Sequence, residues 1–161
     1  MAVVAIDPGM RHTGLVHMEG WHVLDAKTIA FRKGVGQDNL LARERAGEIA
    51  QEVTAWLASH DHACVVLEGF TGFTSRQGVY AWQTPFLVGY LLRELATESV
   101  ALQTSRQVLN PRSTGNVARY ANAMAEGRDP FESGGKLITN EHLRSAAAHG
   151  IYYYQRERRH V

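Results

Sequence analysis

Several features that mark other classes of protein are scarce in this chain. It has a single cysteine, Cys64, inside an apolar stretch, so we expect neither a disulfide framework nor a thiolate zinc site. There is no run of about eighteen apolar residues, which predicts no membrane-spanning helix. The N-terminus lacks the basic and then apolar pattern of a secretory signal. Together these absences predict a cytoplasmic protein.

An excess of charge of one sign is also lacking. The chain has 17 lysine and arginine residues against 16 aspartate and glutamate residues, so it is not a polycation. Only three of the basic residues are lysine, and the rest are arginine. Arginine favours two-pronged contacts with phosphate. It is also frequent in some heat-adapted families, so composition leaves nucleic-acid binding open.

Hydrophobic periodicity predicts an α/β fold. The length of 161 residues suits one compact domain, which we expect to span residues 1–161. The order of the elements predicts a five-stranded mixed sheet flanked by helices, in which three antiparallel strands precede strands that return through helices and lie parallel. The expected strands are 3–7, 13–19, 21–30, 63–68 and 100–103, and the expected helices are 39–59, 85–96 and 139–154.

Capping residues and loops complete this outline. Asp38 or Asn39 is expected to cap the first helix, Thr84 the second, and Thr139 or Asn140 the last. Residues 69–79 and 110–138 are expected to form loops. A loop as long as the second one is usually functional or disordered.

Two acidic residues each end an apolar strand. Asp7 ends the first strand and is followed by a tight turn, and Glu68 ends the fourth. A charge removed from water needs a partner, such as a metal ion, and ligand sites in such sheets lie at the carboxyl ends of strands. If these strands are neighbours, the acids converge. The sequence therefore predicts a divalent-cation site, although each acid alone is compatible with a helix cap or a surface charge.

The last expected helix supplies further candidate ligands. At about 100° per residue, Glu141, His142, Ser145 and His149 fall within one arc facing the sheet. His142 and His149 are two turns apart, roughly 10 Å along the axis. We therefore expect them to flank a pair of ions about 4 Å apart rather than to share one ion. Most of the other histidines, His12 among them, are expected to be surface or loop residues.

The motifs around these residues resemble those of a known family. Asp7-Pro8-Gly9-x-x-x-x-Gly14 and Val66-Leu67-Glu68 resemble the first and second motifs of RuvC-type Holliday junction resolvases, in the RNase H-like superfamily. Glu-His-x-x-Ser-Ala-x-x-His, from Glu141 to His149, resembles the third motif of phage-type members. The resemblance covers nearly the whole chain in element order. It implies an RNase H-like fold, a bacterial or phage-encoded protein, and a homodimer that makes paired symmetric nicks in four-way DNA junctions using two divalent ions per subunit, Mg²⁺ or Mn²⁺.

The resemblance also implies roles for individual residues. The two acids of the family correspond to Asp7 and Glu68, and the last helix supplies an acid or histidine followed by an acid three residues on. His142 fits the first of these positions, but the second falls on Ser145, which is a poor metal ligand. His149 is then the candidate replacement, with Glu141 in reserve. The implied catalytic and metal-binding set is Asp7, Glu68, His142 and His149.

DNA contacts and the dimer contact are predicted outside this set. Phe73 lies in the loop after Glu68 and is expected to wedge into an opened base stack, with core packing as the alternative. Arg76 and Arg112 flank loops and are expected to contact phosphates, with a solvated surface position as the alternative. Helix 85–96 is apolar nearly all round, which predicts either a central core helix or a dimer contact through Phe86, Tyr90 and Leu91.

Three other functions remain to be distinguished. Because Ser145 stands where the family has an acid, one alternative is a protein that binds junctions without cutting them. The fold class is also compatible with an RNase H-type nuclease acting on RNA–DNA hybrids. An actin-like or sugar-kinase-like ATPase is disfavoured because it needs two such domains and because the chain has no P-loop. No nucleotide cofactor is expected.

Overall fold

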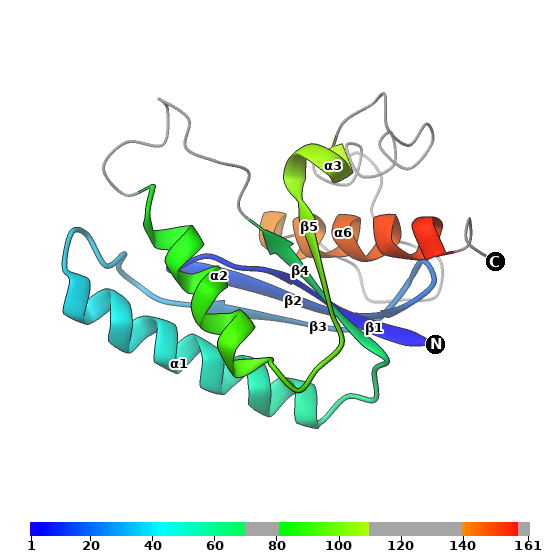
Figure 1. Cartoon of the computed structure of the whole chain (residues 1–161), viewed down its shortest axis with the longest axis horizontal. Coiled ribbons are helices and arrows are strands. Elements are labelled where there is room, and N and C mark those ends of the chain that lie inside the picture. The colour runs from blue at the N-terminus through cyan, green and yellow to red at the C-terminus, as the bar shows by residue number, and fades with distance from the viewer. Residues whose placement is uncertain (70–80, 110–139, 158–161) are drawn as a thin grey trace.

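The computed structural model describes residues 1–69, 81–109 and 140–157 (Figure 1). Its sheet has five strands in the order β3-β2-β1-β4-β5. The first three strands pair antiparallel, whereas β4 lies parallel to both β1 and β5. The strands are β1 (Ala2–Asp7), β2 (His12–Glu19), β3 (His22–Ala30), β4 (Cys64–Gly69) and β5 (Val100–Thr104). The predicted mixed sheet is confirmed, and every predicted strand end lies within one residue of the observed one.

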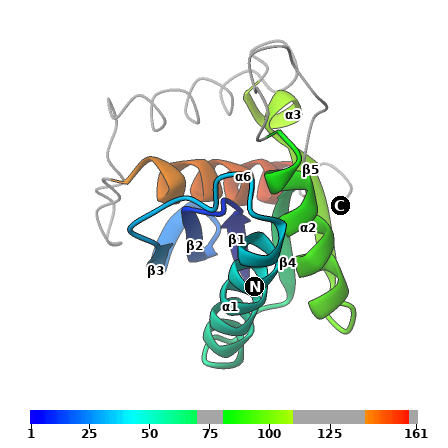
Figure 2. The same ribbon diagram turned by 90° about the vertical axis from the view of Figure 1, so that its left-hand side faces the viewer.

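Helices cover both faces of this sheet. The helices α1 (Asn39–Ala58) and α2 (Gln83–Glu94) pack on one face, and α6 (Glu141–Glu157) packs on the other (Figure 2). A short helix that the sequence did not predict, α3 (Ser105–Leu109), follows β5 directly. Within the described ranges, none of the helices combines the length and apolar character that crossing a bilayer would need.

Two of the three predicted helix starts are confirmed. The Asp38 carboxylate accepts a hydrogen bond from the backbone N–H of Leu41 at 2.9 Å and so caps α1. The Asn140 side-chain oxygen accepts from the backbone N–H of His142 at 2.9 Å and caps α6. The prediction that Thr84 caps α2 is wrong, because that helix begins at Gln83 and has no side-chain cap.

Alternation along the strands sorts side chains between the two helical layers. In β1, Val4 and Ile6 pack with α1 and α2, whereas Val3 and Ala5 pack with α6. The same alternation directs Asp7 toward α6. In β4, Cys64 and Val66 face α6, so Glu68 points that way too. Period-two alternation thus delivers both acids to one side of the sheet.

The exposure of α2 contradicts one of the two predicted alternatives, that of a central core helix. Leu87, Val88 and Leu91 are buried, while Phe86 and Arg93 are exposed. Leu91 has no exposed surface and belongs to the core of its own subunit. Its prediction as a dimer contact is therefore wrong, because a side chain that is fully covered has no surface left for a partner. Phe86 and the half-buried Tyr90 still have exposed surface for the predicted dimer contact.

Candidate active site

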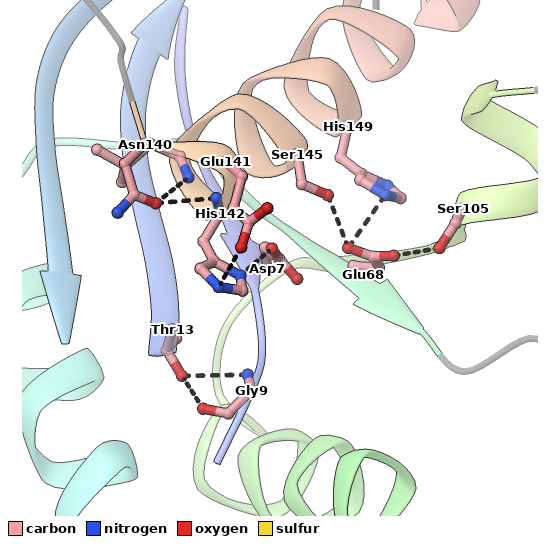
Figure 3. A network of polar contacts seen from close by, with 11 residues as sticks. Asp7, Gly9, Thr13, Glu68, Ser105, Asn140, Glu141, His142, Ser145 and His149 are labelled. Carbon is pink, nitrogen blue, oxygen red and sulfur yellow. Dashed lines mark hydrogen bonds and ion pairs between the residues drawn. The ribbon is translucent and has the colours of Figure 1, made fainter. Parts of the chain in front are cut away.

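Asp7 and Glu68 lie side by side at the carboxyl ends of β1 and β4. The two strands pair in parallel with Ile6 opposite Leu67, and the next residue along each strand is the acid. Both side chains point toward α6 (Figure 3), and each is only 16% exposed. The structure thus brings the two acids together, as the strand order predicts.

Thr13 stabilises the turn after Asp7 through two hydrogen bonds with Gly9. The buried Thr13 hydroxyl donates to the carbonyl oxygen of Gly9 at 2.9 Å and accepts from its N–H at 3.3 Å (Figure 3). A Cβ atom on Gly9 would lie 2.5 Å from the carbonyl oxygen of His12, so only glycine fits this turn. The carboxylate of Asp7 therefore stands on a backbone segment with little freedom to move.

Glycine also allows α6 to lie directly against the sheet. Gly14 is the β2 partner of Asp7, and a Cβ atom there would lie 2.5 Å from the carbonyl oxygen of His142. Near the other end of the contact, a Cβ on Gly150 would overlap the sulfur of Met18. The close approach of helix and sheet brings His142, Ser145 and His149 within reach of the two acids.

His142 pairs with Asp7. Its Nδ1 lies 3.0 Å from Oδ2 of Asp7, and its Nε2 lies 3.6 Å from Oε1 of the exposed Glu141. The ring of His12 stacks on it with a centroid separation of 5.2 Å. His12 is half-buried and begins β2, so it lies in a strand rather than in a loop. His142 itself is 28% exposed, so this ring remains open to a ligand.

Glu68 is held by three partners from two helices. The hydroxyl of Ser105, at the start of α3, donates a short hydrogen bond to Oε1. On the other side, Oε2 accepts from the hydroxyl of Ser145 at 3.1 Å and lies 3.5 Å from Nε2 of His149 (Figure 3). These contacts fix both oxygens of the carboxylate.

The surroundings shift the pKa values of the two acids in opposite directions. Burial raises the pKa of Asp7 to about 6; the hydrogen bond with His142 opposes this rise and the negative charge of Glu68 adds to it. Burial also acts to raise the pKa of Glu68, but the contacts with His149 and Ser105 outweigh it and hold this pKa below its usual range. The hydrogen bond with Asp7 raises the pKa of His142. Two adjacent, largely buried carboxylates thus place negative charge where a bound cation would neutralise it.

The donor set fits a hard divalent cation in part. Carboxylate oxygens are preferred by Mg²⁺ and Mn²⁺, and the partly exposed imidazole of His142 adds a nitrogen donor beside Asp7. In the ranges that the structure describes, however, no three histidine, cysteine, aspartate or glutamate side chains meet in a metal-binding geometry. The four predicted ligands instead form two pairs, Asp7 with His142 and Glu68 with His149.

His149 does not fit the predicted role of metal ligand. Its side chain is only 2% exposed, and its ring nitrogens contact Glu68 and Gln103 inside the protein. A ring enclosed in this way presents no nitrogen to an ion. Of the four predicted ligands, Asp7, Glu68 and His142 are the three with appreciable exposed side-chain surface, although they do not meet around one point as the structure stands.

Two residues around the site were not predicted from the sequence, and three predicted residues lie outside the described ranges. Ser105 and Gln103 both contact this cluster, and the only signal for Gln103 was a polar residue within an apolar strand. The predicted DNA-contacting residues Phe73, Arg76 and Arg112 lie outside the described residues.

The fold of this chain is similar to that of known structures. No protein-family model and no curated protein matches the chain. It does align with Thermus thermophilus RuvC solved in complex with a Holliday junction substrate, at 22% identity and a TM-score of 0.68 over 98% of this chain and 96% of that one. A second Thermus thermophilus RuvC structure aligns at 24% identity with the same TM-score and coverage. The chain has a RuvC-like fold. On this fold, Asp7 and Glu68 lie at the carboxyl ends of neighbouring strands of the mixed sheet beneath α6.

Proposed function

We propose that this chain is a structure-selective endonuclease that resolves four-way DNA junctions by metal-dependent hydrolysis of phosphodiester bonds. The observation that carries the proposal is the pair of adjacent carboxylates, Asp7 and Glu68, beneath a helix that brings His142 within 3.0 Å of Asp7. A RuvC-like fold supports it, because one aligned structure is a resolvase in complex with its junction substrate.

Each residue of the site has a separate task in this proposal. Asp7 and Glu68 would hold the divalent ions, two per subunit if the resemblance to RuvC-type resolvases extends to metal count. Bound there, Mg²⁺ or Mn²⁺ would activate the attacking water and stabilise the leaving 3′ oxygen. If Nδ1 of His142 donates its proton to Asp7, its Nε2 is left as an acceptor for a proton from the attacking water.

Exposed arginines border the site and suit a polyanionic substrate. Arg11 lies in the turn after Asp7, and Arg106 follows Ser105 in α3. Contacts from such side chains to phosphate would give salt-dependent affinity with little sequence preference. Contacts from Phe73, Arg76 and Arg112 stay part of the proposal. So do a homodimer that makes paired nicks, a phage-type origin, and action in the bacterial cytoplasm.

Cleavage of a defined set of substrates tests the proposal. Purified protein is incubated with a labelled four-way junction, a matched duplex and an RNA–DNA hybrid, each with Mg²⁺, Mn²⁺ or EDTA. We expect paired symmetric nicks in the junction alone, and none with EDTA. Asp7→Asn and Glu68→Gln should abolish cutting but still bind the junction, while Glu44→Gln, at an exposed position on α1, should cut normally. Equal cutting of duplex or hybrid would contradict junction selectivity.

A second candidate function is binding of four-way junctions without cleavage. It is favoured by Ser145, because this residue offers a hydroxyl to Glu68 where the resemblance implies an acid. Salt-dependent junction binding with no nicks, even in Mn²⁺, would support this candidate over the endonuclease.

A further inference from the structure

The buried pair of Gln103 and His149 stands directly behind Glu68. His149 comes from α6 and Gln103 from β5, and they meet with His149 Nδ1 3.3 Å from Gln103 Oε1. Both residues are buried, at 1% and 7% exposure. A polar side chain so far from water is costly unless it is hydrogen-bonded. Each of these two side chains supplies the other with a partner.

The position of Gln103 in its strand explains why it reaches this place. Ala101, two residues earlier in β5, packs with the apolar layer beneath α6. Alternation therefore directs Gln103 to the same layer. A polar residue there interrupts an otherwise apolar face, and it does so opposite the one histidine of α6 that is fully covered. The placement indicates a role for the amide beyond filling space.

The contacts of Glu68 indicate how the pair of Gln103 and His149 acts on this carboxylate. A carboxylate has about four acceptor positions on its two oxygens. Ser105 takes one on Oε1, and Ser145 and His149 take two on Oε2. Asp7 stands beside Glu68 on the neighbouring strand, where Ile6 pairs with Leu67, and it also acts on the pKa of Glu68. The three partners therefore hold the Glu68 carboxylate in one orientation beside Asp7.

We infer that Gln103 and His149 are positioning residues, which hold Glu68 in the orientation that faces Asp7 and so pre-form the cation site. His149 acts through Glu68 and touches neither ion nor DNA, and Gln103 acts through His149. The catalytic meaning of this arrangement rests on the proposed function. Groups that orient a metal-binding carboxylate typically change metal affinity by about 10–100-fold when they are removed.

Metal binding without DNA tests the inference. Mn²⁺ affinity is measured by calorimetry for the wild type, Gln103→Leu, His149→Leu and His149→Gln. Both leucine variants should bind Mn²⁺ about 10–100-fold more weakly. His149→Gln should recover part of the loss, because its amide N–H can still reach Glu68. Ile151→Val is the packing control: it shortens a buried side chain of α6 that belongs to the apolar cluster under this helix, and it should leave Mn²⁺ affinity unchanged.

The outcomes separate this inference from the proposed function. If His149→Leu does not fold, Gln103→Leu and His149→Gln decide the matter. Folded Gln103→Leu that binds Mn²⁺ like the wild type overturns the inference, even if the wild type cuts junctions. Weaker Mn²⁺ binding in that variant supports it, even if the wild type cuts no junction. A wild type that binds no Mn²⁺ overturns both. A crystal structure of Gln103→Leu should show the Glu68 carboxylate turned away from Asp7.

Discussion

At the scale of single residues, Asp7 and Glu68 are neighbours whose surroundings act on their charges in opposite directions. Burial raises the pKa of Asp7 from 3.8 to about 6. Ionised Asp7 is therefore less favourable in the folded state than in the unfolded state, and the fold loses stability as the pH rises through that range. The contacts around Glu68 lower its pKa, so its charge stabilises the fold above the ordinary pKa of a glutamate. That stabilisation is lost as the pH falls through the lowered value.

Neutral isosteres at the two positions should therefore have opposite effects on stability. At pH 8 with EDTA, Asp7→Asn should raise the free energy of unfolding, by on the order of 1–3 kcal/mol for a pKa shift of this size. Glu68→Gln should lower it, because the contacts with His149 and Ser105 lose their charge. Urea denaturation measures both. Near pH 4 the gain from Asp7→Asn should shrink, since Asp7 is then largely protonated. Changes of the same sign in both variants would contradict the assigned environments.

Residues differ in how far the sequence predicts their role. Asp7 and Glu68 are predictable because strand alternation and strand order fix their direction and neighbourhood. Gln103 and Ser105 are not, because no local pattern encodes their contacts: that of Gln103 depends on the distance between β5 and α6, and that of Ser105 on how α3 lies against the end of β4. His149 lies on the predicted arc of its helix, but its burial depends on the neighbouring strand. Helical periodicity alone could not separate it from the more exposed His142.

At the scale of elements, the packing of α6 on β2 decides whether the site can form. Gly14 lies where a Cβ atom would meet the backbone of His142, which has no flexible end that could move aside. At Gly150 the obstacle is the sulfur of Met18, a flexible side chain that can adjust. The two glycines therefore differ in how much an added methyl group would disturb the helix.

Gly14→Ala should be the more damaging of two matched substitutions. We expect it to destabilise the fold by about 1–3 kcal/mol or more, as overpacking does, and to weaken Mn²⁺ binding by pushing His142 away from Asp7. Gly150→Ala should cost less, since Met18 can shift and alanine favours a helix. Gly34→Ala is the control, because nothing lies within 4 Å of its added Cβ. Denaturation curves rank the three, and an undisturbed Gly14→Ala would show that α6 is free to move outward.

Elements are predicted well where a local signal is strong and poorly where it is not. The five strands and the start of α1 follow from alternation and from the Asp38 cap, both of which act within a few residues. The five-residue α3 was missed because it is too short to show a period. For α2, apolar content does not tell which side faces the core, so the sequence left a core helix and a dimer contact as alternatives. There Leu91 is covered by its own subunit while Phe86 stays exposed.

At the scale of the whole molecule, a row of aromatic side chains at α2, with Phe86 exposed, bears on the predicted homodimer. Trp82, just before the helix, is followed by Phe86 and Tyr90 within it, with ring centroids 5.9 Å and 6.4 Å apart. Trp82 and Tyr90 are half-buried. Arg93 places its guanidinium 4.5 Å from the centre of the Tyr90 ring. Aromatic and arginine side chains are enriched in protein interfaces. Since α2 covers the face of the sheet opposite α6, two subunits joined there would leave both sites uncovered.

Phe86→Glu should therefore convert a dimer into a monomer without unfolding the subunit. The side chain is exposed, so the charge costs little in an isolated subunit, whereas two charges facing each other across a twofold contact would repel. Sedimentation velocity measures the mass and circular dichroism the fold. Leu40→Glu, at an exposed position on α1, is the control and should remain dimeric. If the wild type is already monomeric at micromolar concentration, or if Phe86→Glu stays dimeric, subunits do not associate through α2. Paired nicking would then require another surface.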